Sequence, residues 1–229
     1  MRKGIGFLSG NQIKILALIA MTCDHAGKFL FPDCAILQII GRLAYPIFAY
    51  MIAEGCTYTK NRKKYLGLLA LSALLCQTVY LVMMHSLYQC IMVTFTLSVV
   101  LIYLWERVRT QNSTMRFCIA LFATLSVYIA AEILPRVFLG SGFYIDYGFF
   151  GVMLPVIVYF TQGRKRKLAA LAFMLALIAS GSATIQWFSF AAIPILACYN
   201  QTRGKRRMKY FFYIYYPAHM ALIYLISLI

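Results

Sequence analysis

The chain has 229 residues, of which 62% are hydrophobic, 16% aromatic and only 12% charged. A water-soluble domain carries about 25% charged residues, so this composition excludes a soluble globular protein. The formal net charge of +16 raises the possibility of nucleic-acid binding, but the basic residues lie in short segments between apolar runs. That distribution is typical of cytoplasmic loops in membrane proteins. We therefore expect the lipid bilayer, and no nucleic acid, as a partner.

Apolar segments that approach the roughly 20 residues needed to cross the hydrocarbon layer follow one another along the chain. The first comes after Met1-Arg2-Lys3 and runs past Phe31. We interpret it as a retained helix, because it is longer than a signal peptide and has no small-residue cleavage site. The sequence thus predicts an all-α, polytopic membrane protein with about nine transmembrane helices in a single domain, 1–229. The expected spans are 11–31, 35–55, 65–84, 88–105, 117–135, 146–162, 168–184, 186–200 and 210–229.

The basic clusters predict how these helices are oriented. They cover 62–64, 107–116, 164–167 and 203–209, and a pair of expected spans separates each cluster from the next. Because positive loops stay in the cytoplasm, we expect all four clusters and the N-terminus on the cytoplasmic side of the plasma (inner) membrane. The two segments after 167 are short, so one kinked helix there, giving eight spans, is the alternative.

Ionisable residues are concentrated in the first two predicted helices. A charged side chain in the membrane costs roughly 2.5–3.5 kcal/mol on insertion scales, so such residues are candidates for function. Asp24, His25 and Arg42 lie at similar depths in helices that meet at the same side. Neighbouring residues on a helix point about 100° apart, so Asp24 is expected to pair with Arg42 or with Lys28 rather than with His25. We expect His25 to act as a general base that Asp24 and Arg42 orient.

Two further positions in these helices suit the binding of an acyl donor. Lys14 and His25 are eleven residues apart, so they share one face of the helix and are separated by about 16 Å along it. This spacing suits a long, phosphate-bearing donor such as coenzyme A, with phosphates near Lys14. A lysine that reaches back to the membrane surface is the structural alternative. Arg42 or Tyr45 is expected to stabilise the oxyanion that forms during acyl transfer.

The remaining candidates lie later in the chain. His219 is near the middle of the last predicted helix, where it either binds the acceptor or only hydrogen-bonds a neighbouring helix. Asp146 and Tyr147 border an outer loop. They either form the rim of a substrate cleft or are simply solvated residues at the ends of helices. The seven cysteines have no metal-ligand spacing, so we expect no metal. GxSxG, Walker and HExxH motifs are missing, which removes most soluble-enzyme mechanisms.

At these positions the sequence resembles the TraX family, whose founding members are associated with conjugation and acetylate the N-terminus of pilin. The resemblance implies acetyl-CoA as the donor. The TraX family is also similar to a wider group of membrane acyltransferases. In that group an arginine precedes the histidine of the first helix with ten residues between them, and here Lys14 stands in for that arginine. The stretches that carry the resemblance are KILALIAMTCDH (14–25), GRLAYPIFAYMIAEG (41–55), DYG (146–148) and FFYIYYPAH (211–219).

The sequence therefore predicts a membrane acyltransferase that moves an acetyl group from cytoplasmic acetyl-CoA to an amine or hydroxyl. The acceptor is a peptide N-terminus, a glycan or a lipid in the membrane or at its outer face. The alternative hypothesis is a non-enzymatic transporter or assembly factor, in which the Asp24, His25 and Arg42 cluster relays protons or locks helices together. The sequence leaves the oligomeric state open.

Overall fold

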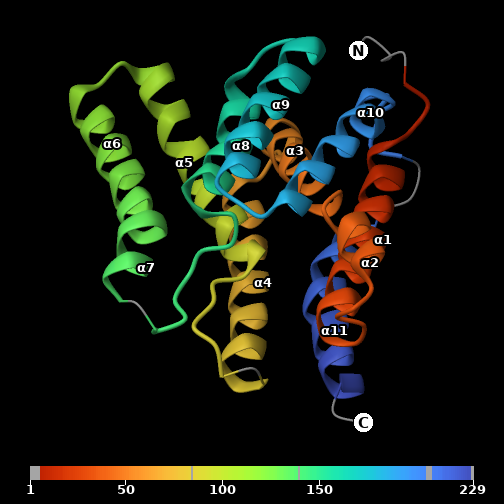
Figure 1. Cartoon of the computed structure of the whole chain (residues 1–229). Helices are drawn as coiled ribbons and strands as arrows, with labels where there is room; N and C mark the ends of the chain where they lie inside the picture. Colours follow the sequence, from red (N-terminus) through yellow and green to blue (C-terminus); the bar gives the residue numbers. More distant parts are fainter. Residues whose placement is uncertain (1–5, 84, 139, 205–207, 228–229) are drawn as a thin grey trace. The chain divides into compact units, whose positions relative to one another are not determined.

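The computed structural model describes residues 6–83, 85–138, 140–204 and 208–227, and these residues form helices without a named strand (Figure 1). The predicted all-α class is confirmed. Grouped by their interruptions, the described helices make nine segments. These are α1 (Gly10–Phe29), α2 (Ala35–Gly41) with α3 (Ala44–Tyr58), α4 (Arg62–Met83), α5 (Ile91–Gln111), α6 (Thr114–Tyr128) with the π-helix η1 (Ile129–Ile133) and α7 (Leu134–Val137), α8 (Gly148–Phe160), α9 (Arg164–Ser180), the 3-10 helix η2 (Thr184–Ala191) with α10 (Ala192–Ala197), and α11 (Lys209–Ser227).

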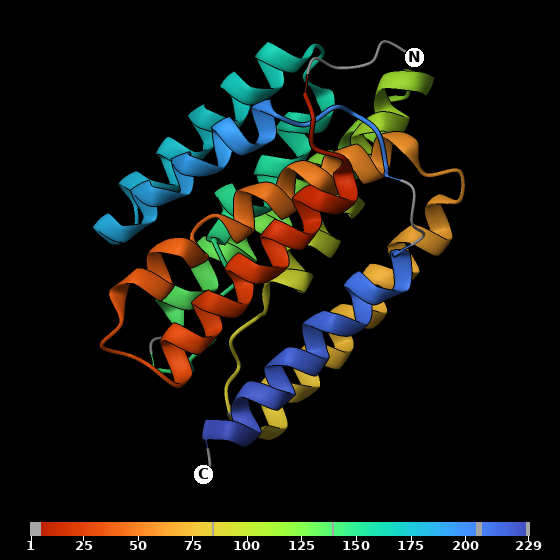
Figure 2. The same ribbon diagram turned by 90° about the vertical axis from the view of Figure 1, so that its right-hand side faces the viewer.

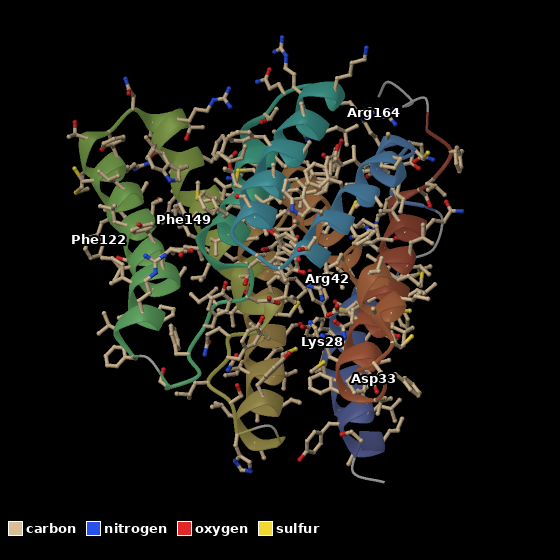
Figure 3. All side chains as sticks on the ribbon, in the orientation of Figure 1. Lys28, Asp33, Arg42, Phe122, Phe149 and Arg164 are labelled. Atoms are coloured by element: carbon tan, nitrogen blue, oxygen red, sulfur yellow. The ribbon has the colours of Figure 1, made fainter. Side chains whose placement is uncertain are left out.

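Within the described residues, four of these segments are long and apolar enough to cross a membrane, namely Ala35–Tyr58, Arg62–Val82, Ile91–Gln111 and Thr114–Val137. Their outward faces are apolar. Phe122 on α6, for example, is 73% exposed and points away from the neighbouring helices in Figure 3. Exposed phenyl rings along a helix are costly in water and favourable in lipid. The chain is thus a membrane protein, with about nine helical segments of which four are clear spans.

The chain divides into two compact units, of which the first comprises Met1–Met51 and Thr161–Ile229 and the second Ile52–Phe160. The expected single domain remains a prediction, and each unit is described by itself. In unit 1 the chain before α1 runs beside the chain that follows α10. Leu8 donates its backbone N–H to Cys198 O (2.9 Å), and Gly10 donates to Thr202 O (2.7 Å). The start of α1 and the segment that follows α10 therefore share one end of unit 1.

The basic cluster at the start of α9 lies at that same end. The Lys167 ammonium is 5.9 Å from the centre of the Tyr50 ring, whose edge packs against Tyr199. Figure 3 shows Arg164 and Asp33 at opposite ends of unit 1, and Figure 2 shows α9 and η2 with α10 as an antiparallel pair. Two helical segments thus separate the cluster 164–167 from Arg203, as the charge pattern predicted. Residues 1–5 and 205–207, which hold the basic residues of the N-terminus and three of those in the cluster 203–209, lie outside the described residues.

Unit 2 is organised in the same way. An ion pair between Arg62 Nη2 and Glu106 Oε1 (2.7 Å) joins the start of α4 to the last part of α5, so the basic clusters 62–64 and 107–116 share an end. At the opposite end, Gln89 N–H donates to Tyr144 O (2.8 Å) and Asp146 N–H to Gln89 O (3.1 Å). The pairing of basic ends is therefore present in each unit, while the cytoplasmic orientation remains a prediction.

Candidate functional site

One group of polar side chains in unit 1 lies where α1 packs against α11. These two helices run in the same direction (Figure 1 and Figure 2). Thr22 Oγ1 and Tyr215 Oη are 2.8 Å apart, and His25 Nδ1 and His219 Nε2 are 2.7 Å apart, with stacked rings. Both imidazoles are buried. A buried polar side chain in a membrane helix needs a partner within the protein, and α1 and α11 supply one another's.

The hydrogen bonds of this pair fix the tautomers of the two rings. His219 Nδ1 lies 3.0 Å from the backbone carbonyl of Tyr215, and a carbonyl oxygen only accepts, so Nδ1 of a neutral His219 carries the hydrogen. Its Nε2 is then the acceptor, and His25 Nδ1 must donate to it. The lone pair of His25 is left on Nε2. A neutral imidazole held in this tautomer is the form that a general base requires.

Asp24 belongs to a second cluster on a different side of α1. Its carboxylate forms ion pairs with Lys28 Nζ (2.5 Å) and with Arg42 Nη2, the two partners predicted from helix geometry. Arg42 also donates from Nε to Gln38 O and from Nη1 to Gln186 Oε1, both at 3.3 Å. Figure 3 shows Lys28 and Arg42 on neighbouring helices. One carboxylate thus holds two cations, and His25 is oriented by His219 rather than by Asp24.

Proline chemistry explains why Arg42 lies at this place. The predicted helix 35–55 is interrupted between Gly41 and Ala44, and Pro46 lies four residues after Arg42. Proline has no N–H to donate to the carbonyl four residues earlier, and its ring clashes with that carbonyl. These effects favour an interruption at Arg42, although α8 and α11 continue through an internal proline. Arg42 therefore lies in the short link between α2 and α3, from which its guanidinium reaches Asp24.

Close packing of α1 against α2 depends on glycine, and we predict that Gly41→Ala destabilises unit 1. A Cβ at Gly41 would collide with the Cβ and Oδ1 of Asp24, so the carboxylate or the helix must move, at a cost of about 1–3 kcal/mol. Thermal unfolding in detergent measures the change. Gly67→Ala on α4 is the matched control, because nothing lies within 4 Å of its added Cβ and alanine favours a helix. Equal effects of both variants would contradict the prediction.

The two residues predicted to help bind the acyl donor lie on α1 and α3. Lys14 is half-buried, with its ammonium 5.4 Å from the centre of the Phe212 ring, and Tyr45 is buried. Arg203 joins Lys14 at this end, because its carbonyl accepts the N–H of Asn11, one turn before Lys14. The donor-binding role of Lys14 and Tyr45 stays a prediction.

Asp146 and Tyr147 belong to unit 2, where they form the turn before α8. Tyr88 Oη donates to Asp146 Oδ1, and Thr94 Oγ1 donates to the Asp146 carbonyl (2.8 Å). Tyr147 has a φ of +61°, a left-handed conformation that is uncommon for a bulky residue. Glu132, which η1 places beside this turn, accepts the N–H of Phe149 in the first turn of α8 (3.0 Å). These contacts describe an ordered turn, and the predicted role of Asp146 and Tyr147 in acceptor binding remains a prediction.

The Tyr88–Asp146 hydrogen bond yields a testable stability effect. Burial, and then the nearby Asp146 carboxylate, raise the pKa of Tyr88 above its usual value. The folded protein therefore keeps a phenol proton that the unfolded chain loses, so stability is constant in this respect below about pH 10 and falls as the pH rises further. Tyr88→Phe is expected to lose about 1.5–3 kcal/mol and to lack this alkaline component. Thermal unfolding between neutral pH and pH 11 tests both points, and an unchanged alkaline decline in the variant would contradict them.

Sequence reasoning missed part of the polar network around Arg42. Gln186 and Ser189 on η2 are buried, and Gln186 binds Arg42. The signal was present, because these are polar residues three apart in an otherwise apolar and aromatic stretch. It was not interpreted as an inward polar face of the expected span 186–200. The contact of His25 with His219 was also missed, although both residues were singled out.

Comparison with known proteins gives the following relatives. No solved structure matches the chain. The chain is 25% identical to the probable fimbrial assembly protein FimC, serogroup H1, of Dichelobacter nodosus, over 97% of each chain. It is 50% identical to the uncharacterised protein RP591 of Rickettsia prowazekii (strain Madrid E) over 40 residues, which are 18% of this chain and 16% of that protein. The family model of the TraX protein matches residues 9–227. Because that match covers nearly the whole chain, the chain belongs to the TraX family.

Proposed function

We propose that this membrane protein is an acyltransferase that moves an acetyl group from cytoplasmic acetyl-CoA to an amine or hydroxyl, with His25 as the general base. The observation that supports this most directly is the buried His25–His219 pair. The Tyr215 carbonyl fixes the tautomer of His219, and His219 Nε2 in turn fixes the tautomer of His25. The partners of catalytic histidines generally act in this way.

The reaction follows from the free nitrogen position on His25. Nε2 of His25 takes the proton from the acceptor's N–H or O–H. At the same time the lone pair of the acceptor nitrogen or oxygen attacks the thioester carbonyl carbon, which forms a tetrahedral oxyanion. The C–S bond then breaks, and the departing thiolate of coenzyme A receives the proton from His25. While His25 is protonated, its Nδ1–H stays bonded to His219 Nε2, so the two rings share the added charge. The products are the acetylated acceptor and coenzyme A.

The charged groups on α1 have distinct roles in this proposal. Lys14 and Arg203 bind the phosphates of the donor at the basic end of unit 1, and the acyl end lies about 16 Å further along α1, near His25. The Asp24–Lys28–Arg42 cluster has two cations and one anion, so its net positive charge favours an oxyanion nearby. Tyr45 is the alternative donor to this oxyanion. The basic ends face the cytoplasm, where acetyl-CoA is, in a multi-pass orientation in the inner membrane.

The acceptor class is suggested by the relatives. One of them is named as a probable fimbrial assembly protein, and a fimbrial subunit's N-terminal amine is an acceptor of the required chemistry. A glycan hydroxyl and a lipid headgroup amine have the same reactive groups. Asp146 and Tyr147 in unit 2 are proposed to contact the acceptor.

A reconstitution experiment tests the proposal against the transporter or assembly-factor alternative. Purified protein is mixed with [14C]acetyl-CoA and with membranes from cells that lack the chain, and label in protein, glycan and lipid fractions is counted. The proposal expects label in one fraction and an equal release of coenzyme A. Mass spectrometry then locates the added acetyl group. Movement of a solute across liposomes with no coenzyme A release would instead support a transporter, and neither activity would support an assembly factor.

A further inference from the structure

The 3-10 helix η2 has an unusual distribution of side chains. Its exposed side carries Trp187 and Phe188, each about half exposed, whereas Gln186 and Ser189 are 4% and 0% exposed. Residues three apart eclipse one another in a 3-10 helix, so the side chains of Gln186 and Ser189 leave the helix in the same direction, inward. Runs of this kind longer than three or four residues are uncommon, and η2 has eight residues. An unusual backbone thus places two polar groups side by side in the interior of unit 1.

Both side chains have polar atoms without a partner. Among the described residues, Gln186 Nε2 and Ser189 Oγ are buried and make no hydrogen bond. The orientation of the Gln186 amide follows from its other end, since Arg42 Nη1 can only donate and the atom that faces it at 3.3 Å must be the carbonyl oxygen. The NH2 group therefore points away from Arg42. A buried donor without a partner costs about 1–3 kcal/mol, so each such group needs an explanation, and a ligand that completes it is one.

The chemistry of these atoms limits what they bind. An amide NH2 only donates, and a serine hydroxyl can donate as well, so the matching group is an oxygen that accepts two hydrogen bonds. The adjoining Arg42, Lys28 and Asp24 carry a net positive charge, which favours an oxygen with negative charge. A carbonyl oxygen that becomes an oxyanion meets both conditions.

We propose that Gln186 Nε2 and Ser189 Oγ form a subsite that binds a substrate oxygen beside Arg42 and strengthens its grip as that oxygen gains negative charge. This proposal rests on the acyltransferase function. Two substrates bear such an oxygen, namely the thioester carbonyl of acetyl-CoA and a carbonyl or carboxylate of the acceptor. Arg42 acts through Gln186, because its bond to the amide oxygen sets the direction of the N–H donors.

Two substitutions separate substrate binding from structural support. Gln186→Glu keeps an oxygen facing Arg42 and replaces the donor with an acceptor, and Ser189→Ala removes a hydroxyl that has no partner. Labelled acetyl transfer from acetyl-CoA to membranes of cells lacking the chain is expected to fall about 10- to 100-fold in either variant. The melting temperature of Ser189→Ala should equal or exceed that of the natural protein, because removing an unpaired buried hydroxyl costs no bond.

Matched variants control for the substitutions themselves. Gln111→Glu makes the same change at an exposed position at the end of α5 in unit 2, at a residue with no proposed role in substrate binding. Ser180→Ala removes an exposed hydroxyl that binds its own helix. Both should transfer acetyl groups at the natural rate.

Infrared spectra of bound acetyl-CoA with a 13C-labelled carbonyl identify the source of the oxygen. If the donor supplies it, the carbonyl stretch lies at lower frequency in the natural protein than in Gln186→Glu. If the acceptor supplies it, the stretch is the same in both and transfer still falls; each result supports the subsite. Unchanged transfer in both variants, or a Ser189→Ala melting temperature that falls while transfer is unchanged, overturns it in favour of a bound water. No transfer by the natural protein overturns the acyltransferase function itself.

Discussion

Replacing His25 with alanine is expected to reduce acetyl transfer about 100- to 10,000-fold, the range that a general base contributes. The variant should still insert and fold, because His219 keeps its bond to the Tyr215 carbonyl within its own helix. Transfer of label from acetyl-CoA, normalised to the amount of folded protein on size-exclusion chromatography, measures the effect. His85→Ala is the matched control, since His85 is an exposed histidine in a loop of unit 2.

The same experiment distinguishes the base from its positioning residue. His219→Leu removes the acceptor for His25 Nδ1–H, so the ring can take the other tautomer and place its hydrogen on Nε2, where it blocks proton abstraction. His219→Gln supplies an amide oxygen near the original Nε2 and should recover part of the activity. If His25→Ala transfers acetyl groups at the natural rate, the proposed mechanism is wrong. If glutamine and leucine at 219 behave alike, the positioning role is wrong.

Asp24→Asn is expected to destabilise unit 1 by about 3–5 kcal/mol, the cost of leaving a buried charge without its partner. The Asp24 and Arg42 side chains are only 12% and 13% exposed, so solvent gives the guanidinium little compensation. Thermal or denaturant unfolding in detergent measures the loss. Asp24→Asn combined with Arg42→Met should recover most of it, because the double variant buries no unpaired charge at either position.

The control for this ion pair lies in unit 2. Arg136 pairs with Glu132 at 3.5 Å, but its side chain is 77% exposed, so Arg136→Met should change stability by less than about 1 kcal/mol. A double variant at 24 and 42 that loses the sum of the two single effects would show that these residues do not interact energetically.

Helix geometry was sufficient to predict the local contacts of α1. The 100° rotation per residue separates Asp24 from His25, and one turn brings Asp24 to Lys28, as the structure shows. The Arg42 pairing followed because the first two helices are adjacent in sequence. The resemblance at 14–25 and 211–219 identified the family, which the family match confirmed.

The contacts between distant helices could not be predicted in this way. His25 and His219 are 194 residues apart, and a helix that is apolar on all sides gives no signal about which neighbour it packs against. The position of Gln186 depends on a 3-10 backbone, whereas the expected span 186–200 assumed an α-helix that began at this residue. The break at Arg42 was encoded by Pro46 but was not deduced, since proline near a helix start is usually tolerated.

The direct contact of α1 with α11 has a consequence for biosynthesis. Ribosomes add roughly 5–20 residues per second, so the 194 residues between the two histidines take about 10 to 40 s to synthesise. Throughout that interval the imidazole of His25 has no partner from α11. A truncated product that stops before Tyr215 never acquires that partner.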